Sequence, residues 1–180
     1  MAGILMTDPG FGRGQTLGVS SADQGGSVTG TQKTFTDSDP RTSNAGKWLS
    51  NRPVTCIAVR NTSGGALLPG DAVKFKATAI LDEVDGKAPS AAAGTLIGIV
   101  DEYLPATGVA DQDVCWVVVS GPTAITTSAS PAAGAALTVT AGKAAAAAAE
   151  KPAEVIGVAI AAKVGTTVRA LVGVKSEHSA

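Results

Sequence analysis

The 180-residue sequence has few of the residues from which catalytic and metal sites are built. Its only histidine, His178, lies near the last residue, and its only cysteines are Cys56 and Cys115. Two cysteines make neither a disulfide framework nor a four-ligand zinc site, and both lie in apolar stretches typical of small core residues rather than reactive thiols. A histidine at a chain end is a poor candidate for a catalytic base. The sequence therefore predicts no metal site and no nucleophile–base pair.

Excess charge and long apolar runs are also missing. Lysine and arginine number 14 against 15 aspartates and glutamates, which gives a net charge of -1. This balance does not favour nucleic acid or an acidic membrane surface as a direct partner. No stretch provides the roughly 18 uninterrupted apolar residues that cross a bilayer. The start, Met1–Met6, lacks the basic and apolar parts of a signal peptide, so we expect no membrane partner and no standard secretion.

Aromatic residues are scarce, since Phe, Trp and Tyr total only six, whereas 33 residues are alanine and 22 are glycine. The core must therefore be built from small and β-branched side chains. Such side chains offer little of the aromatic surface that usually lines a substrate pocket. The glycine-rich stretch 10–14 lacks the spacing of a dinucleotide-binding loop, and no strand pattern precedes it. No cofactor is expected.

Two groups of carboxylates are candidate sites. Asp82, Glu83 and Asp85 cluster as in a calcium loop, but Leu81 stands at the first ligand position, so a hairpin turn at Asp85-Gly86 explains them better. Asp101 and Asp111 flank a loop, where two acids either meet for acid–base work or solvate the loop. Solvation is favoured because no base or pocket-forming aromatic residue accompanies them. The sequence therefore predicts a protein that is not an enzyme.

Residues 1–52 are rich in Gly, Ser, Thr and Asp and show no hydrophobic period of 2 or 3.6. So little apolar surface cannot offset roughly 1–2 kcal/mol per residue of backbone ordering, which predicts an extended N-terminal arm. Two interpretations stay open: a mobile tail, or an arm that folds onto a neighbouring subunit. Trp48, with Leu49, alternatively caps the barrel of its own subunit. The candidate anchors of the arm are the scattered large apolar residues Phe11, Leu17, Phe35 and Trp48.

Residues 53–180 have the pattern of a β-rich core domain, with short apolar runs separated by turn residues. In the run Ala72–Ala79 apolar and polar residues alternate, which indicates a strand with one wet face. Leu96–Val100 and Val114–Val119 are apolar throughout and predict strands buried on both faces. A further strand is expected over Val54–Arg60. The predicted fold is all-β, a small β-barrel or β-sandwich.

The second half of the core resembles the first half at low fidelity, which predicts a duplicated β unit, although such short words also arise by chance in a chain rich in Ala and Val. The alanine run Ala144–Ala149 favours helix by propensity, but it follows a strand pattern and is closed by Pro152. A helical turn and a short strand are both open, with strand favoured. The matching segments are Gly70–Phe75 with Gly134–Val139, Ile97–Val100 with Ile156–Ala159, and Trp116–Gly121 with Arg169–Gly173.

The order of four segments resembles the capsid cement, or decoration, proteins of tailed bacteriophages. The segments are Val59–Lys74, Ile97–Asp101, Val114–Pro122 and Pro152–Ala159, and the resemblance covers about residues 54–175, with the leader similar only in texture. It implies a small β-barrel or β-sandwich, commonly a trimer, that sits on the outside of an expanded phage head and reinforces it. It carries no catalytic residues over to this sequence.

We therefore expect a virion structural protein, assembled in the host cytoplasm, that binds the outside of a phage capsid and bridges neighbouring subunits. The expected partners are the major capsid protein and further copies of the chain in a homotrimer, because several modest contacts made together give strong binding. One alternative is a phage fibre or tail adhesin that binds a host receptor through loops such as 106–112. A less favoured alternative is a small β-barrel hydrolase using Asp101 and Asp111.

Overall fold

The structure is a computed structural model that describes residues 10–18, 28–41, 47–78, 81–92, 95–148 and 154–173. All the secondary-structure elements identified in these ranges are β-strands, which confirms the all-β prediction. Within the same ranges, no helix has the length and apolar character needed to cross a membrane. The strands are β1 (Thr16–Leu17), β2 (Gln32–Asp39), β3 (Lys47–Asn61), β4 (Ala72–Phe75), β5 (Glu83–Lys87), β6 (Ile97–Val100), β7 (Val114–Thr126), β8 (Ala136–Thr140), β9 (Lys143–Ala146), β10 (Gly157–Ala159) and β11 (Thr167–Val172).

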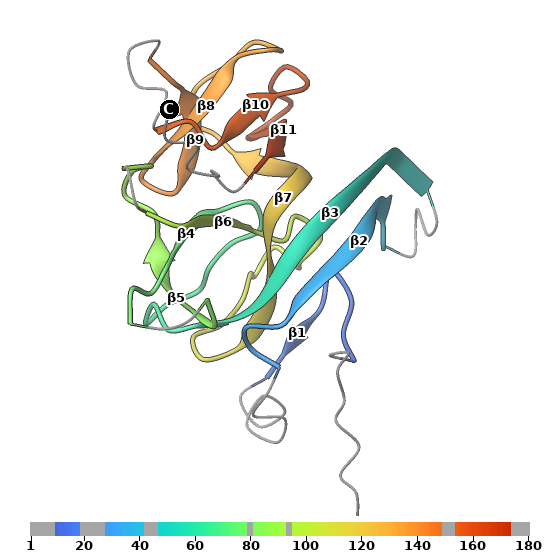
Figure 1. Cartoon of the computed structure of the whole chain (residues 1–180), viewed down its shortest axis with the longest axis vertical. Coiled ribbons are helices and arrows are strands. Elements are labelled where there is room, and N and C mark those ends of the chain that lie inside the picture. Colours follow the sequence, from blue (N-terminus) through green and yellow to red (C-terminus); the bar gives the residue numbers. More distant parts are fainter. Residues whose placement is uncertain are drawn as a thin grey trace, which may run out of the picture.

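Strands β3 to β7 form a small closed barrel in the lower half of the molecule (Figure 1). β3 pairs with β5 in parallel and with β7 antiparallel, β4 pairs antiparallel with β5 and β6, and β6 pairs with β7. The ring closure leaves none of these strands as a free edge. The barrel interior is filled by one apolar cluster: Ile57, Val59, Leu67, Val73, Phe75, Val84, Val100, Leu104, Val109, Cys115, Val117 and Val119.

A second, smaller ring lies above the first in Figure 1 and shares β7 with it. The C-terminal half of β7 pairs with β11, β11 with β10, β10 with β8, and β8 with β9. A bridge between Thr127 and Ala144 brings β9 back to the end of β7. β7 passes from one ring to the other at Gly121, where φ is +107° and an added Cβ would lie 2.3 Å from the Pro53 carbonyl oxygen. Only glycine fits this crossing.

The two rings repeat the same strand pairing, position by position. Gly70 and Gly134 both have positive φ, and their N–H groups donate to the carbonyls of Val100 and Ala159. These are the positions that the sequence alignment matched, so the structure supports the predicted duplicated β unit. The register agrees as well: Val73 opposite Gly98 corresponds to Leu137 opposite Gly157, and Ile99 opposite Val118 corresponds to Val158 opposite Leu171.

Three local predictions have different outcomes. The alanine run begins in strand β9, as favoured. The strand expected over Ala72–Ala79 ends at Phe75. Asp85 and Gly86 do not form the hairpin turn but lie inside β5, so that prediction is wrong. Asp85 and Gly86 lie between the two positions at which β5 pairs with β4, where the register shifts, and Gly86 has a φ of +132°, so the dipeptide forms an irregularity within the strand.

The predicted border between an arm of residues 1–52 and a core of residues 53–180 falls inside β3. β2 pairs with β3 along its length, and β1 pairs with β7 through Thr16 and Leu17. β1, β2 and the first residues of β3, which belong to the predicted arm, are therefore strands of the same sheet as the core. Composition did not show this because strand pairing satisfies backbone groups and buries alternate side chains even in a polar segment.

Candidate functional site

Residues 10–18, called the strap here, lie across the outer face of the first barrel and are fixed there by an aromatic cluster. The Phe11 ring stacks on Trp116 of β7 with 4.8 Å between centroids and 19° between planes. The Phe35 ring of β2 meets Trp116 edge-on at 5.2 Å. Trp116 Nε1 donates a hydrogen bond of 3.2 Å to the Phe11 carbonyl oxygen. Phe11 is only 4% exposed, so the strap is part of the core.

A chain of ion pairs continues from the strap to the second barrel. Arg13 Nε donates to Asp101 Oδ1 at 3.0 Å, and both side chains are buried. Its guanidinium also lies 4.6 Å from the centre of the Tyr103 ring. Arg169 of β11 donates to Glu102 Oε1 at 2.8 Å and pairs with Asp37 of β2. These contacts tie the strap, β2 and both barrels together.

Burial shifts the pKa values of several side chains in this region. Burial raises the pKa of the Cys56 thiol to about 12, and burial also raises the pKa of Cys115. Both thiols are therefore protonated and unreactive at neutral pH, as expected for core cysteines. Burial raises the pKa of Glu102, opposed by the nearby Arg169 and Arg13. Arg13, Asp101, Glu102 and Arg169 all take part in the ion pairs described above.

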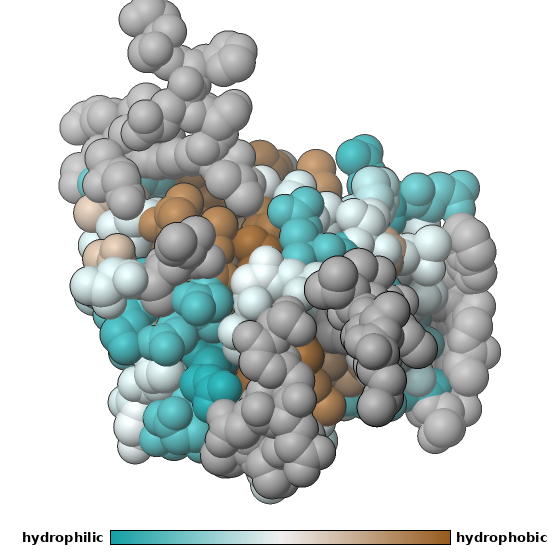
Figure 2. Space-filling view, turned by 60° about the horizontal axis from the view of Figure 1, so that its bottom comes forward, coloured by the Kyte–Doolittle hydropathy of each residue, from teal (hydrophilic) through white to brown (hydrophobic). Residues whose placement is uncertain are grey.

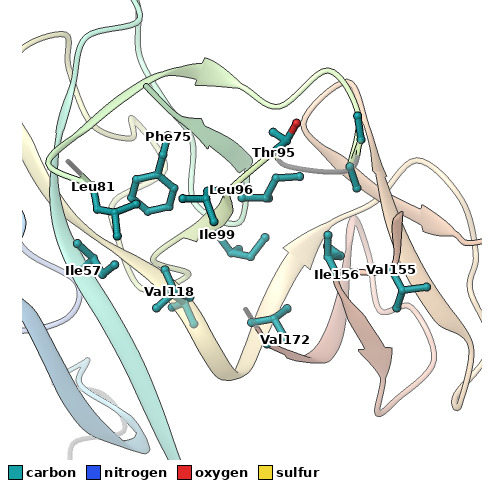
Figure 3. Close-up of a pocket in the computed structure, with 15 residues that line it drawn as sticks. Ile57, Phe75, Leu81, Thr95, Leu96, Ile99, Val118, Val155, Ile156 and Val172 are labelled. Carbon is teal, nitrogen blue, oxygen red and sulfur yellow. The ribbon is translucent and has the colours of Figure 1, made fainter. Parts of the chain in front are cut away.

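A second feature is an apolar pocket of about 300 Å³ between the two barrels (Figure 3). Phe75, Leu81 and Ile57 gather on the side of the first barrel, and Ile156 and Val172 lie on the side of the second. The rim carries Leu96, which is 48% exposed. Thr95 contributes the one polar side chain among the residues that line the pocket. The pocket suits an apolar group and offers no proton-transferring side chain.

Large apolar side chains are also exposed outside the pocket. Figure 2 shows one face of the molecule, on which apolar surface gathers into a patch bordered by hydrophilic surface. Exposed patches of this kind mark contacts with other macromolecules more often than scattered single residues do. Beyond the pocket rim, the exposed large apolar residues are Leu49, Leu68, Val158, Ile160 and Val164.

The four candidate anchors have different places in the structure. Phe11 and Phe35 pack on Trp116 of their own chain, and Leu17 packs against the same apolar cluster. Trp48 lies in β3, and its side chain is outside the described residues. A capsid contact by any of them stays a prediction. The strap partners Arg13 and Asp101 were missed, because they are 88 positions apart and no local pattern joins them.

The carboxylates that the sequence offers as candidate sites form other contacts. Asp101 is held by Arg13, whereas Asp111 accepts a hydrogen bond from the Gly64 N–H at 2.8 Å, so the structure does not pair them for acid–base work. Glu83 and Asp85 form ion pairs with Lys76 and Lys74. Among the described residues, no three potential ligands of His, Cys, Asp or Glu gather into a group that could hold a metal ion.

No protein-family model matches the sequence, and the comparison with curated proteins found no match. Among solved structures, the chain is similar to the base of the N-terminal part of the head fibre protein gp8.5 of bacteriophage phi29. The TM-score is 0.46 and the sequence identity 16%, and the likeness covers 69% of this chain and 99% of that one.

Proposed function

We propose that the protein is a non-enzymatic structural protein of a tailed-phage virion, which binds the outside of the capsid and stabilises it by bridging neighbouring subunits. The observation that carries the proposal is the distribution of side chains. Apolar residues of both barrels face solvent, whereas Arg13, Asp101 and Arg169 are committed to ion pairs that hold the fold. Such a surface binds another macromolecule.

The choice of partner rests on the resemblance of residues 54–175, roughly, to capsid cement proteins. The two barrels are tied by the Arg169 ion pairs, and each presents exposed apolar side chains, which sets the spacing between them. Fixed spacing lets one molecule contact two capsid subunits at once without an ordering cost. In this proposal Leu49 and Val164 are contact residues, and the strap stabilises the first barrel.

The test is co-sedimentation of the purified chain with DNA-free expanded capsids of the phage that encodes it. We expect saturable binding and a higher temperature of capsid disruption. Val164→Asp, at a side chain that is 78% exposed, should weaken binding by about tenfold or more, because a charge must then be desolvated at the contact. Thr140→Asp, a charge added at another exposed position, is the matched control.

Two outcomes would overturn this proposal. The first is that the chain does not sediment with capsids. The second is that it binds intact host cells and not capsids, which would favour the adhesin function instead.

A further inference from the structure

The pocket between the barrels is an apolar surface that the described residues leave open. Its lining combines the mouth of the first barrel, at Phe75 and Leu81, with Ile156 and Val172 of the second. Leu96 at the rim faces solvent. Apart from Thr95, the lining side chains offer water no hydrogen-bond partner, so filling the pocket with aliphatic side chains is favourable. The pocket therefore fits a short run of large apolar residues.

The chain itself supplies such a run outside the described residues. Phe11 is buried, whereas Gly10 is exposed, so the first described residue lies at the surface. Residues 1–9 precede it and contain Ile4-Leu5-Met6, a run of consecutive large aliphatic residues. Thr7, Asp8 and Pro9 separate this run from the strap. At about 3.3 Å per extended residue, the run reaches roughly 20 Å from Gly10.

The position of the strap favours a pocket on another molecule. β1, which belongs to the strap, lies at the lower end of the molecule, whereas the pocket lies higher, between the two barrels, and is lined by residues of β4, β6 and β11 (Figure 1). We propose that Ile4, Leu5 and Met6 of one copy occupy the pocket between the barrels of a second copy. The contact is head-to-tail, and such contacts build closed rings when the rotation between copies closes. This association needs no capsid and stands apart from the proposed function.

A mixing experiment with two single-cysteine variants tests the proposal in the full-length chain. Leu5→Cys chains are mixed with Leu96→Cys chains and oxidised mildly in the absence of capsids. We expect a disulfide-linked pair that contains one chain of each kind. The native thiols do not compete, because Cys56 and Cys115 are buried. The matched control replaces Leu96→Cys by Val164→Cys, which is exposed but does not line the pocket.

Equal cross-linking of Leu5→Cys to position 164 would overturn the proposal. A disulfide formed only inside single chains of the Leu5→Cys/Leu96→Cys double variant would also overturn it, since the occupant would then be the chain's own segment. Capsid binding can succeed or fail independently of these results.

Sedimentation equilibrium gives a second measurement that requires no cysteine. Replacing Ile4, Leu5 and Met6 together by serine should raise the dissociation constant of self-association by about tenfold or more for each aliphatic side chain removed. Thr7→Ser, a conservative change beside the run, is the control. The thermal unfolding midpoint of the triple variant should match that of the wild type in dilute solution. Unchanged self-association of the triple variant would contradict the proposal.

Discussion

The two barrels share one strand register but differ in how they are filled. At equivalent interior positions the first barrel has the larger side chain: Phe75 against Val139, Val84 against Ala144, Val100 against Ala159, and Val117 against Ala170. Backbone pairing therefore determines the shared ring of strands. Side-chain volume determines how much apolar surface each barrel buries. The second barrel buries less and relies more on its contacts with the first.

The outer faces differ even more than the interiors. On the first barrel, Ile99 is 2% exposed because the strap, β2 and the second barrel enclose this face. The equivalent residue of the second barrel, Val158, is 42% exposed. The position that holds Trp116 in the first copy holds Arg169 in the second, and its charge is used to join the barrels. At the equivalent positions Ile99 and Val158, the first copy thus buries its apolar side chain, whereas the second copy exposes it.

The largest loss of stability is expected from Phe11→Ala, which removes the strap side chain that covers Trp116 on the outer face of the first barrel. Loss of the ring that stacks on Trp116 should cost about 3–5 kcal/mol in the free energy of unfolding. Urea unfolding followed by fluorescence measures it. Val164→Ala, at a solvent-exposed position, should change stability by no more than about 0.5 kcal/mol. If Phe11→Ala cost less than about 1 kcal/mol, the strap would not be part of the core.

A matched pair of substitutions compares the two outer faces directly. Ile99→Ala removes a buried side chain and should cost about 2–5 kcal/mol. Val158→Ala removes a half-exposed one and should cost well under about 1 kcal/mol at concentrations where the chain is monomeric. Equal costs in urea unfolding would mean that the face of the second barrel is covered after all.

The next smaller effect concerns the glycines that let strands approach closely in both copies. An added Cβ would lie 2.1 Å from Val117 Cγ1 at Gly98, and 2.3 Å from the Leu171 carbonyl oxygen at Gly157. Alanine at either position should cost about 1–3 kcal/mol. Gly157→Ala should lose more stability than Gly98→Ala. At Gly157 the added Cβ would meet the hydrogen-bonded backbone of β11, which moves less easily than the Val117 side chain at Gly98. Gly173→Ala, which has open space, is the control. Thermal unfolding that ranked Gly173→Ala with the other two would contradict this account.

Features with a local pattern could be predicted from the sequence. Runs such as Val114–Val119 are apolar throughout and became strands buried on both faces, as in β7. The repeat was visible because glycines such as Gly70 and Gly134 are required by backbone geometry, which is retained when side chains change. The apolar stretches around Cys56 and Cys115 likewise placed both cysteines in the core.

Features that depend on topology could not be predicted. Arg13 and Asp101 meet only because the strap crosses β7 beside the end of β6, and neither residue has a neighbour that signals the pair. The burial of Phe11 likewise depends on Trp116, which is 105 positions away. A polar segment with isolated aromatic residues looks the same whether these fill its own core or a partner's surface.

The smallest expected effect is a pH dependence of the contact between the barrels. Burial, opposed by Arg169 and Arg13, raises the pKa of Glu102 above its ordinary value of 4.5. From about that value up to the raised one, the folded chain holds this proton more than the unfolded chain does, so this group's contribution to stability falls as pH rises. Glu102→Gln lacks the titration. The stability of the wild type relative to Glu102→Gln should therefore be greatest near pH 4 and decline towards neutral pH, as measured by urea midpoints across that range. If the wild type instead gained on the variant with rising pH, the ion pairs of Glu102 with Arg169 and Arg13 would outweigh the cost of its burial between the barrels.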